Sequence, residues 1–282
     1  MSDSPSPYVP TRSLAGTTMI MSGGSRGIGL AIALRAAADG ANVVLIAKTA
    51  EPHPKLPGTI YTAAEEIEAA GGKALPIVGD IRDQDSIAGA VAKTVEEFGG
   101  IDLCVNNASA IDLAPAGSLS AKKYDLMQSI NARGTFLLSS ACLEHLAKSD
   151  NAHILTLSPP INLDPRWAGA HLGYTISKYG MSLCTLGLAE QGKENGVAAN
   201  SLWPRTLIAT AAVLNLLGGD DSAARSRGPE IMGDAAHAVL TRPAAKCTGN
   251  FLIDDEVLAE EGVTDLDSYQ YGDHEPMLDL FL

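Results

Sequence analysis

The chain has 282 residues, 46% of them hydrophobic and 19% charged, which is ordinary for a globular protein with one large α/β core. Its formal net charge of −13 disfavours nucleic acid or an anionic membrane as a partner, because both attract basic surfaces. The sequence holds no run of about 18 apolar residues and no signal-peptide core, so we expect a cytoplasmic protein. The six histidines and four cysteines lack metal-ligand spacing, and no metal site is expected.

Short apolar runs alternate with helical patterns along most of the chain. In chain order we predict strand 17–22, helix 30–38, strand 41–47, helix 61–70, strand 74–79, helix 85–98, strand 101–105, helix 122–148, strand 153–157, helix 174–191, strand 197–203 and strand 250–253. Seven strands alternating with six helices, five of which are located above, predict an α/β fold with a doubly wound parallel sheet and helices on both faces.

A glycine-rich turn follows the first strand and opens the first helix, and it reads Ser22-Gly-Gly-Ser-Arg-Gly-Ile-Gly29. The N-terminus of a helix offers free amides and a positive dipole end to phosphate, and glycine lets the backbone approach closely. The alternative is a plain tight turn. The context favours a dinucleotide site at Gly23, Ser25, Arg26, Gly27, Ile28 and Gly29.

The second strand ends at Lys48, where NAD-binding sites usually carry an acidic residue for the ribose 2′-hydroxyl. Because Arg26 lies in the glycine turn as a second cation, we predict that NADP(H) is preferred, with NAD(H) possible. Lys48 could instead be a solvated loop lysine. Asp80 and Ile81 follow the third strand and are predicted beside the adenine, although Asp80 could also cap the next helix.

Two further patterns lie at the same carboxyl edge of the expected sheet. Asn107 and Ala108 follow the fourth strand and are predicted to line the cofactor cleft. Tyr174 and Lys178 are four residues apart and share one helix face. A nearby ammonium stabilises a phenolate, so this pair can exchange a proton with a carbonyl or an alcohol. The alternative is an ordinary surface pair.

Together, Ser22–Gly29, Asn106–Ala108, Asn131 and Tyr174-x-x-x-Lys178 resemble the short-chain dehydrogenase/reductase family over residues 14–253. The resemblance implies a seven-stranded Rossmann-type sheet, hydride transfer between NADP(H) and a small-molecule carbonyl or alcohol, and a homodimer or homotetramer. It also implies that Asn131 bends its helix and relays protons through water and Lys178. Three stretches are similar to a eukaryotic group in which a sterol-carrier domain follows, and this chain is expected to lack one.

The chain departs from the family pattern at three places. The usual carbonyl-polarising serine would lie 13 residues before Tyr174, and the nearest serine is Ser158; either Ser158 serves or the role is vacant. Ser109 stands where glycine is usual. Pro204-Arg205 replaces Pro-Gly, which weakens the assignment of Ile208 and Thr210 to the nicotinamide amide.

We expect a disordered lead-in over 1–15, a single dinucleotide-binding and catalytic domain over 16–254, and an acidic C-terminal extension over 255–282 that packs on or near the domain. Residues 49–60 form a proline-containing insertion. In the loop 206–228, apolar 211–217 could form a lid hinged at Gly218-Gly219 over a lipophilic substrate, or simply pack on the core. Trp167 and Trp203 are expected beside the pocket. The alternative function is a dinucleotide-binding sensor or scaffold with little catalysis.

Overall fold

A seven-stranded sheet forms the centre of the computed structural model, which describes residues 6–52, 58–211, 213 and 220–282. Its order is β3-β2-β1-β4-β5-β6-β7, and every neighbouring pair is parallel. The strands are β1 (Thr18–Ser22), β2 (Asn42–Ala47), β3 (Lys73–Val78), β4 (Leu103–Asn106), β5 (His153–Thr156), β6 (Ala198–Trp203) and β7 (Phe251–Ile253). The predicted doubly wound parallel sheet is confirmed.

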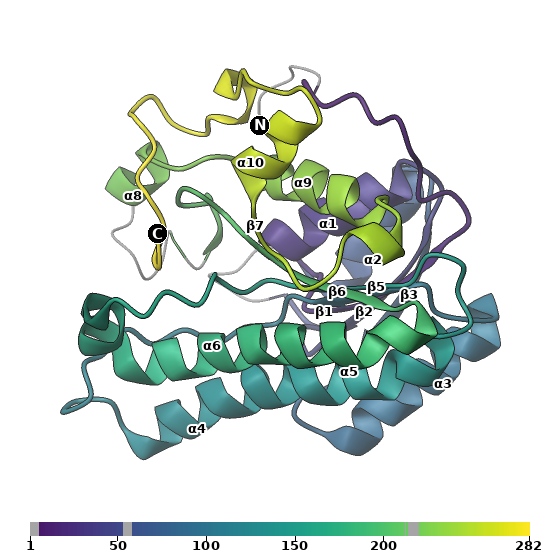
Figure 1. Ribbon diagram of the computed structural model, residues 1–282, viewed down its shortest axis with the longest axis horizontal. Coiled ribbons are helices and arrows are strands. Elements are labelled where there is room, and N and C mark those ends of the chain that lie inside the picture. Colours follow the sequence, from purple (N-terminus) through teal and green to yellow (C-terminus); the bar gives the residue numbers. More distant parts are fainter. Residues whose placement is uncertain (1–5, 53–57, 212, 214–219) are drawn as a thin grey trace.

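Helices cover both faces of the sheet (Figure 1). One layer contains α1 (Gly27–Ala37), α2 (Ile60–Ala69), α9 (Glu230–Leu240) and α10 (Asp254–Glu260), and the other contains α3 (Gln84–Phe98), α4 (Ala121–Ile130), α5 (Ala132–Leu146) and α6 (Pro165–Gly192). The short helices are α8 (Asp220–Ala224), η1 (Lys193–Asn195), η2 (Ala244–Lys246) and η3 (Asp267–Tyr269). No helix within the described residues is both long and apolar enough to cross a membrane.

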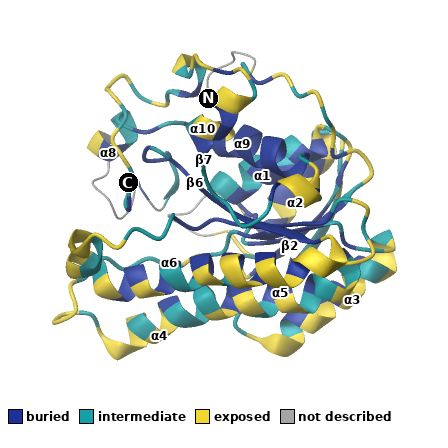
Figure 2. Ribbon diagram, in the orientation of Figure 1, coloured by how far each residue is buried: buried dark blue, intermediate teal, exposed yellow. Residues whose placement is uncertain are grey.

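The sheet is buried on both faces, which explains why its strands are continuous apolar runs. Every residue of β1, β4, β5 and β6 is buried. One apolar cluster lies between the sheet and the layer of α1 and α9, and a second lies between the sheet and the layer of α3, α5 and α6. Figure 2 shows the buried strands between helices whose outer faces are exposed.

Three predicted helices differ from the structure. The expected helix 122–148 is divided at Asn131 into α4 and α5. Helix α6 begins at Pro165, well before the predicted Tyr174, and carries a kink at His171. The sixth helix, which was not located from the sequence, is α9, between β6 and β7, and nearly all its residues are buried.

Residues 6–15 of the expected disordered lead-in 1–15 pack on the domain, and residues 1–5 lie outside the described residues. Tyr8 and Leu14 are buried with the core. The Tyr8 hydroxyl lies 2.9 Å from Nδ1 of His237, a residue of α9. This anchoring could not be read from the polar composition of the segment. Of the predicted lid and its glycine hinge, residues 212 and 214–219 lie outside the described residues.

Candidate active site

The cofactor cleft is predicted between β1 and β4. Strands β1 to β3 are added toward one edge of the sheet and β4 to β7 toward the other, and ligands bind where this order changes. Asn107 braces the glycine turn there, since its Nδ2 donates to the Gly23 carbonyl oxygen at 2.5 Å. The Ser22 hydroxyl oxygen accepts hydrogen bonds from the amides of Asn107 and Ala108, each at 3.2 Å. A Cβ added to Gly29 would lie 2.4 Å from Asn107 Nδ2, so only glycine lets α1 pack this closely.

Helix α1 begins at Gly27, and its N-cap residue Arg26 makes no side-chain capping bond. The first amides of the helix are therefore left to a ligand, which fits the pyrophosphate of a dinucleotide. The Arg26 guanidinium donates from Nη2 to the Gly58 carbonyl oxygen, while its buried Nη1 has no partner among the described residues. An unpartnered buried guanidinium nitrogen fits a further phosphate.

The two predicted ribose and adenine contacts, Lys48 and Asp80, are joined to each other. Lys48 Nζ lies 3.2 Å from Asp80 Oδ2. The Arg82 guanidinium donates hydrogen bonds from Nε and Nη2 to the same carboxylate. The hydrogen bonds from Arg82 are the largest cause that lowers the pKa of Asp80 far below its usual range. Asp80 does not cap α3, because Asp83 accepts the bond from the Asp85 amide. Ile81 is buried in the core.

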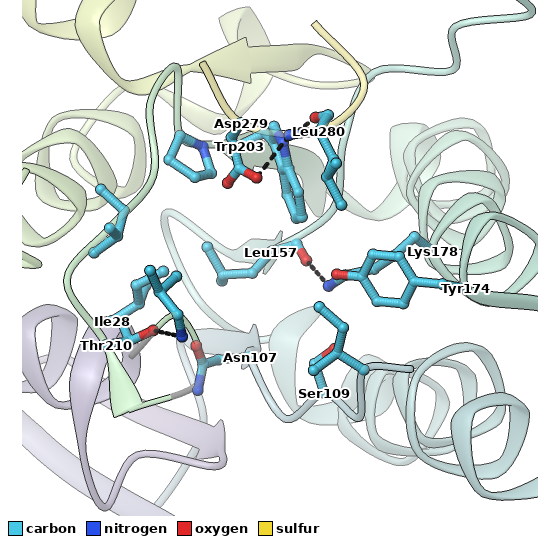
Figure 3. A pocket seen from close by; sticks show the side chains of 14 residues that line it. Ile28, Asn107, Ser109, Leu157, Tyr174, Lys178, Trp203, Thr210, Asp279 and Leu280 are labelled. Carbon is cyan, nitrogen blue, oxygen red and sulfur yellow. Dashed lines mark hydrogen bonds between the residues drawn. The ribbon is translucent and has the colours of Figure 1, made fainter. Parts of the chain in front are cut away.

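Tyr174 and Lys178 lie on α6 and face a cavity of about 180 Å³ (Figure 3). The cavity brings them together with several predicted cofactor residues. Its lining consists of Ile28, Asn107, Ser109, Ile111, Leu157, Tyr174, Lys178, Trp203, Pro204, Ile208, Thr210, Val213, Asp279 and Leu280. Eight of these fourteen side chains are apolar, and the other six carry a polar group.

Burial controls the proton chemistry of this pair. It raises the pKa of Tyr174 far above the usual phenol range, and Asp279 raises it further. It lowers the pKa of Lys178 to about 7, and Asp279 opposes that decrease. Lys178 Nζ donates to the Leu157 carbonyl oxygen at 2.8 Å and lies 5.0 Å from the centre of the Trp203 ring. In this state Tyr174 is neutral, and Lys178 is not among the groups that shift its pKa.

Asn131 is fully buried at the junction of α4 and α5. Its Nδ2 donates to the Ala110 carbonyl oxygen and to the Ser177 hydroxyl, each at 2.9 Å, and its Oδ1 accepts from the Ala110 amide. Ser177 lies between Tyr174 and Lys178 on α6. Asn131 therefore holds this part of α6 against the loop after β4.

Ser158 is outside the cavity lining, which counts against its predicted role at the carbonyl. Its hydroxyl is fully buried, 2.9 Å from the Ser201 hydroxyl, which in turn donates to Thr185. This hydroxyl is engaged between β6 and α6 and is not presented to a substrate. Ser109, which stands in place of the usual glycine, lines the cavity instead.

The C-terminal tail, residues 277–282, forms part of the site, and sequence reasoning did not identify it. Asp279 and Leu280 line the cavity. Phe281 is buried against four aromatic rings, with centroids at 5.6 Å for Trp167, 6.1 Å for Tyr174, 5.4 Å for Tyr179 and 6.1 Å for Trp203. Of the two tryptophans expected beside the pocket, Trp203 lines the cavity, whereas Trp167 contacts Phe281 and is outside the lining.

Specific hydrogen bonds hold the tail in place. The Asp279 amide donates to the Arg205 carbonyl oxygen at 3.0 Å, and Trp203 Nε1 donates to the Leu280 carbonyl oxygen at 2.9 Å. Phe281 has a φ of 74°, the only positive φ of a non-glycine residue in the described part of the chain. A bulky side chain adopts this conformation rarely, and the aromatic contacts compensate for its cost. The polar composition of 265–279 contains no signal for this arrangement.

Comparisons with known proteins agree with this architecture. Residues 17–216 match the family model described as short chain dehydrogenase. The chain is 57% identical over 273 residues to hydroxysteroid dehydrogenase-like protein 2 of Xenopus laevis, which covers 96% of this chain and 65% of that protein. The chain thus spans about two thirds of the length of that curated relative.

Two solved structures extend the comparison. A short chain dehydrogenase from Mycobacterium thermoresistibile is 60% identical, with a TM-score of 0.91 and 96% of each chain covered. A metagenomic short-chain oxidoreductase in complex with NADP is 25% identical, with a TM-score of 0.69, covering 85% of this chain and 97% of that chain. With its parallel seven-stranded sheet, its glycine turn and its Tyr174/Lys178 pair in one cavity, the chain belongs to the short-chain dehydrogenase/reductase family.

Proposed function

We propose that the protein is an NADP(H)-dependent oxidoreductase that interconverts a lipophilic carbonyl compound and the corresponding alcohol. The observation that carries the proposal is the shared cavity, in which Tyr174 and Lys178 meet Ile28 and Asn107 of the cofactor cleft. The apolar lining, including Leu157, supports a lipophilic substrate.

The protein's own groups supply orientation and a proton. When bound, a nicotinamide cofactor supplies or accepts the hydride. Tyr174, neutral because burial raises its pKa, donates its proton to the carbonyl oxygen as that oxygen gains negative charge. Lys178 places an ammonium in the same cavity and is held by the Leu157 carbonyl oxygen. Asn131 acts through Ser177 by holding α6, and it is a positioning residue in this scheme.

The test is the oxidation of NADPH, followed by absorbance, with a panel of aliphatic and aromatic ketones and aldehydes. Tyr174→Phe removes the proton donor and is expected to lower kcat by at least about 100-fold, the usual scale of acid catalysis. Tyr61→Phe, at an exposed tyrosine of α2, is the matched control and is expected to retain full activity. Undiminished turnover by Tyr174→Phe contradicts the mechanism. NADPH binding without turnover of any panel member favours the sensor or scaffold function.

The preference for NADP(H) rests on the basic groups around the cleft. Arg26 has the unpartnered buried Nη1, and Lys48 and Arg82 flank Asp80. Among the relatives, the metagenomic oxidoreductase is described in complex with NADP. A hydrogen bond to a charged group contributes about 1.5–3 kcal/mol, so Arg26→Ala is expected to weaken NADPH binding about 10- to 100-fold. NADH binding should change little. Equal losses for both cofactors in a titration contradict a 2′-phosphate contact.

A homodimer or homotetramer is part of the proposal. Its support is a set of exposed apolar side chains on α4, α5 and α6, namely Leu126, Phe136, Leu172, Ile176, Leu183 and Leu186. Ile176 and Leu183 are seven residues apart and share a helix face. Light scattering of Leu183→Asp should report a smaller particle than the wild type; an unchanged mass argues against this face.

A cytoplasmic location is supported by the four free cysteines, which suit a reducing compartment. Cell fractionation tests it, and recovery of the protein from an oxidising compartment contradicts it.

A further inference from the structure

Asp279 carries a carboxylate into the active-site cavity from outside the family's motifs. The residue lies on the C-terminal tail, and Figure 3 places it opposite Tyr174 and Lys178. Its Oδ1 accepts the Leu280 amide at 2.7 Å. No other hydrogen bond to this carboxylate, and no ion pair within 4.0 Å, exists among the described residues. Oδ2 is therefore left without a donor, in a cavity whose walls are mostly apolar.

The position of Asp279 is maintained by the backbone and is not an accident of a loose chain end. Its amide donates to the Arg205 carbonyl oxygen at 3.0 Å, and Thr206 pairs with Leu278. Two residues later, Phe281 packs on Tyr174, which anchors the tail to the helix that carries the proton donor. A carboxylate held this firmly with a free oxygen is a preformed acceptor for a donor group on a ligand.

The charges around the cavity decide which donor fits. Burial is the largest cause that raises the pKa of Asp279 to about 7. The charge of Lys178 lowers this pKa, and the charge of Asp254 raises it. A substrate ammonium would be repelled by Lys178, and a substrate carboxylate would be repelled by Asp279. A neutral hydroxyl can donate to the carboxylate without adding charge to the cavity.

The amide group of the cofactor does not need Asp279. Ile208 lines the cavity, and its backbone amide has no acceptor among the described residues. The neighbouring amides of Leu207 and Ala209 are both paired, with Met277 and Arg227. Ile208 therefore offers a free donor where the family resemblance places the nicotinamide amide, so the carboxylate remains for the substrate.

We propose that Asp279 is a specificity-determining residue that accepts a hydrogen bond from a hydroxyl group on the substrate, selecting hydroxylated lipophilic carbonyl compounds or diols over their plain counterparts. This inference rests on the proposed oxidoreductase function. It adds a second polar contact beside the reacting carbonyl, and it assigns a role to the C-terminal tail.

The test compares 2-octanone with 1-hydroxy-2-octanone and 4-hydroxy-2-octanone as substrates with NADPH at pH 7, where Asp279 is partly ionised and Lys178 is partly protonated. The wild type is expected to show a higher kcat/KM for at least one hydroxyketone. In Asp279→Asn and Asp279→Ala, that preference should fall by about 10- to 100-fold, the scale of a hydrogen bond to a charged group, with 2-octanone little changed. Asp273→Asn, an exposed aspartate before the tail, is the matched control.

A binding measurement keeps this inference separate from the proposed function. Calorimetry of the NADPH complex with octane-1,2-diol and with 2-octanol involves no turnover. If no ketone is reduced but the diol binds more tightly and only the Asp279 variants lose the difference, the inference stands and the proposed activity fails. If the wild type and the Asp279 variants show the same preference for the hydroxylated compounds, the inference is overturned. So does a loss of NADPH affinity in Asp279→Asn, because the carboxylate would then serve the cofactor.

Discussion

Replacing Phe281 with alanine is expected to open the C-terminal tail while the rest of the domain stays folded. The side chain is 2% exposed, and its ring contacts four other aromatic rings. Truncation of a buried phenylalanine costs about 3–5 kcal/mol. The tail lies at the end of the described chain and is held mainly by this residue and a few hydrogen bonds. The loss should therefore appear as local opening.

At about 1.4 kcal/mol for each tenfold change, the opening equilibrium should increase at least about 100-fold. Hydrogen exchange followed by mass spectrometry measures this in peptides covering 275–282, where the Asp279 amide is bonded to Arg205. Leu278→Ala is the control, because Leu278 is 60% exposed and on the same tail. Opening also exposes Tyr174 to water, so its pKa should fall towards the usual value.

Local opening is refuted if exchange in the tail is unchanged while the melting temperature of the whole domain drops by several degrees. That result would mean that Phe281 is part of the global folding unit. Phe281→Leu keeps most of the buried apolar volume but loses the ring contacts. A smaller increase in exchange than in Phe281→Ala would separate the contribution of apolar burial from that of the aromatic contacts.

The pKa of Asp279 is raised by burial to about 7, so the native protein binds its proton more tightly than the unfolded chain does, and stability is lost as pH rises from about 4 to about 7. In urea titrations, the free energy of unfolding of Asp279→Asn should therefore increase relative to that of the wild type as pH rises from about 4 to about 7. A difference that does not change with pH contradicts the raised pKa. Lys178, whose pKa is lowered to about 7, has the opposite effect from about 7 to 10. Gly29→Ala should weaken NADPH binding because the added Cβ meets Asn107. Gly89→Ala, where the added Cβ has open space around it, should bind NADPH as the wild type does. Equal binding by both variants refutes the close approach at Gly29.

The fold and half of the site are local properties of the chain. The glycine turn must follow β1 directly because its free amides are those of the next helix, and Tyr174 and Lys178 share a face because they are four residues apart. Parallel strands bring their carboxyl ends to one edge, so the order of strands along the chain is enough to place Asn107 near the turn. Spacing and periodicity suffice for each of these features.

Other features depend on contacts between segments far apart in the chain. Ser158 follows β5 as a polarising serine would, yet only its partner Ser201, 43 residues later, shows that its hydroxyl is engaged elsewhere. Helix α9 was not located from the sequence, and in the structure it is packed between α1, more than 190 residues earlier in the chain, and α10.

The sequence alone determined the layered α/β architecture, through the periodicity of successive segments, and it predicted the Tyr174/Lys178 pair, whose residues are four positions apart. Only the tertiary structure revealed that Asp279, far along the chain from Tyr174, lines the same cavity, and that Phe281 packs on the Tyr174 ring. A chain end without regular periodicity encodes no local preference for its destination. Its place is decided by the aromatic cage and backbone acceptors that the folded domain presents to it.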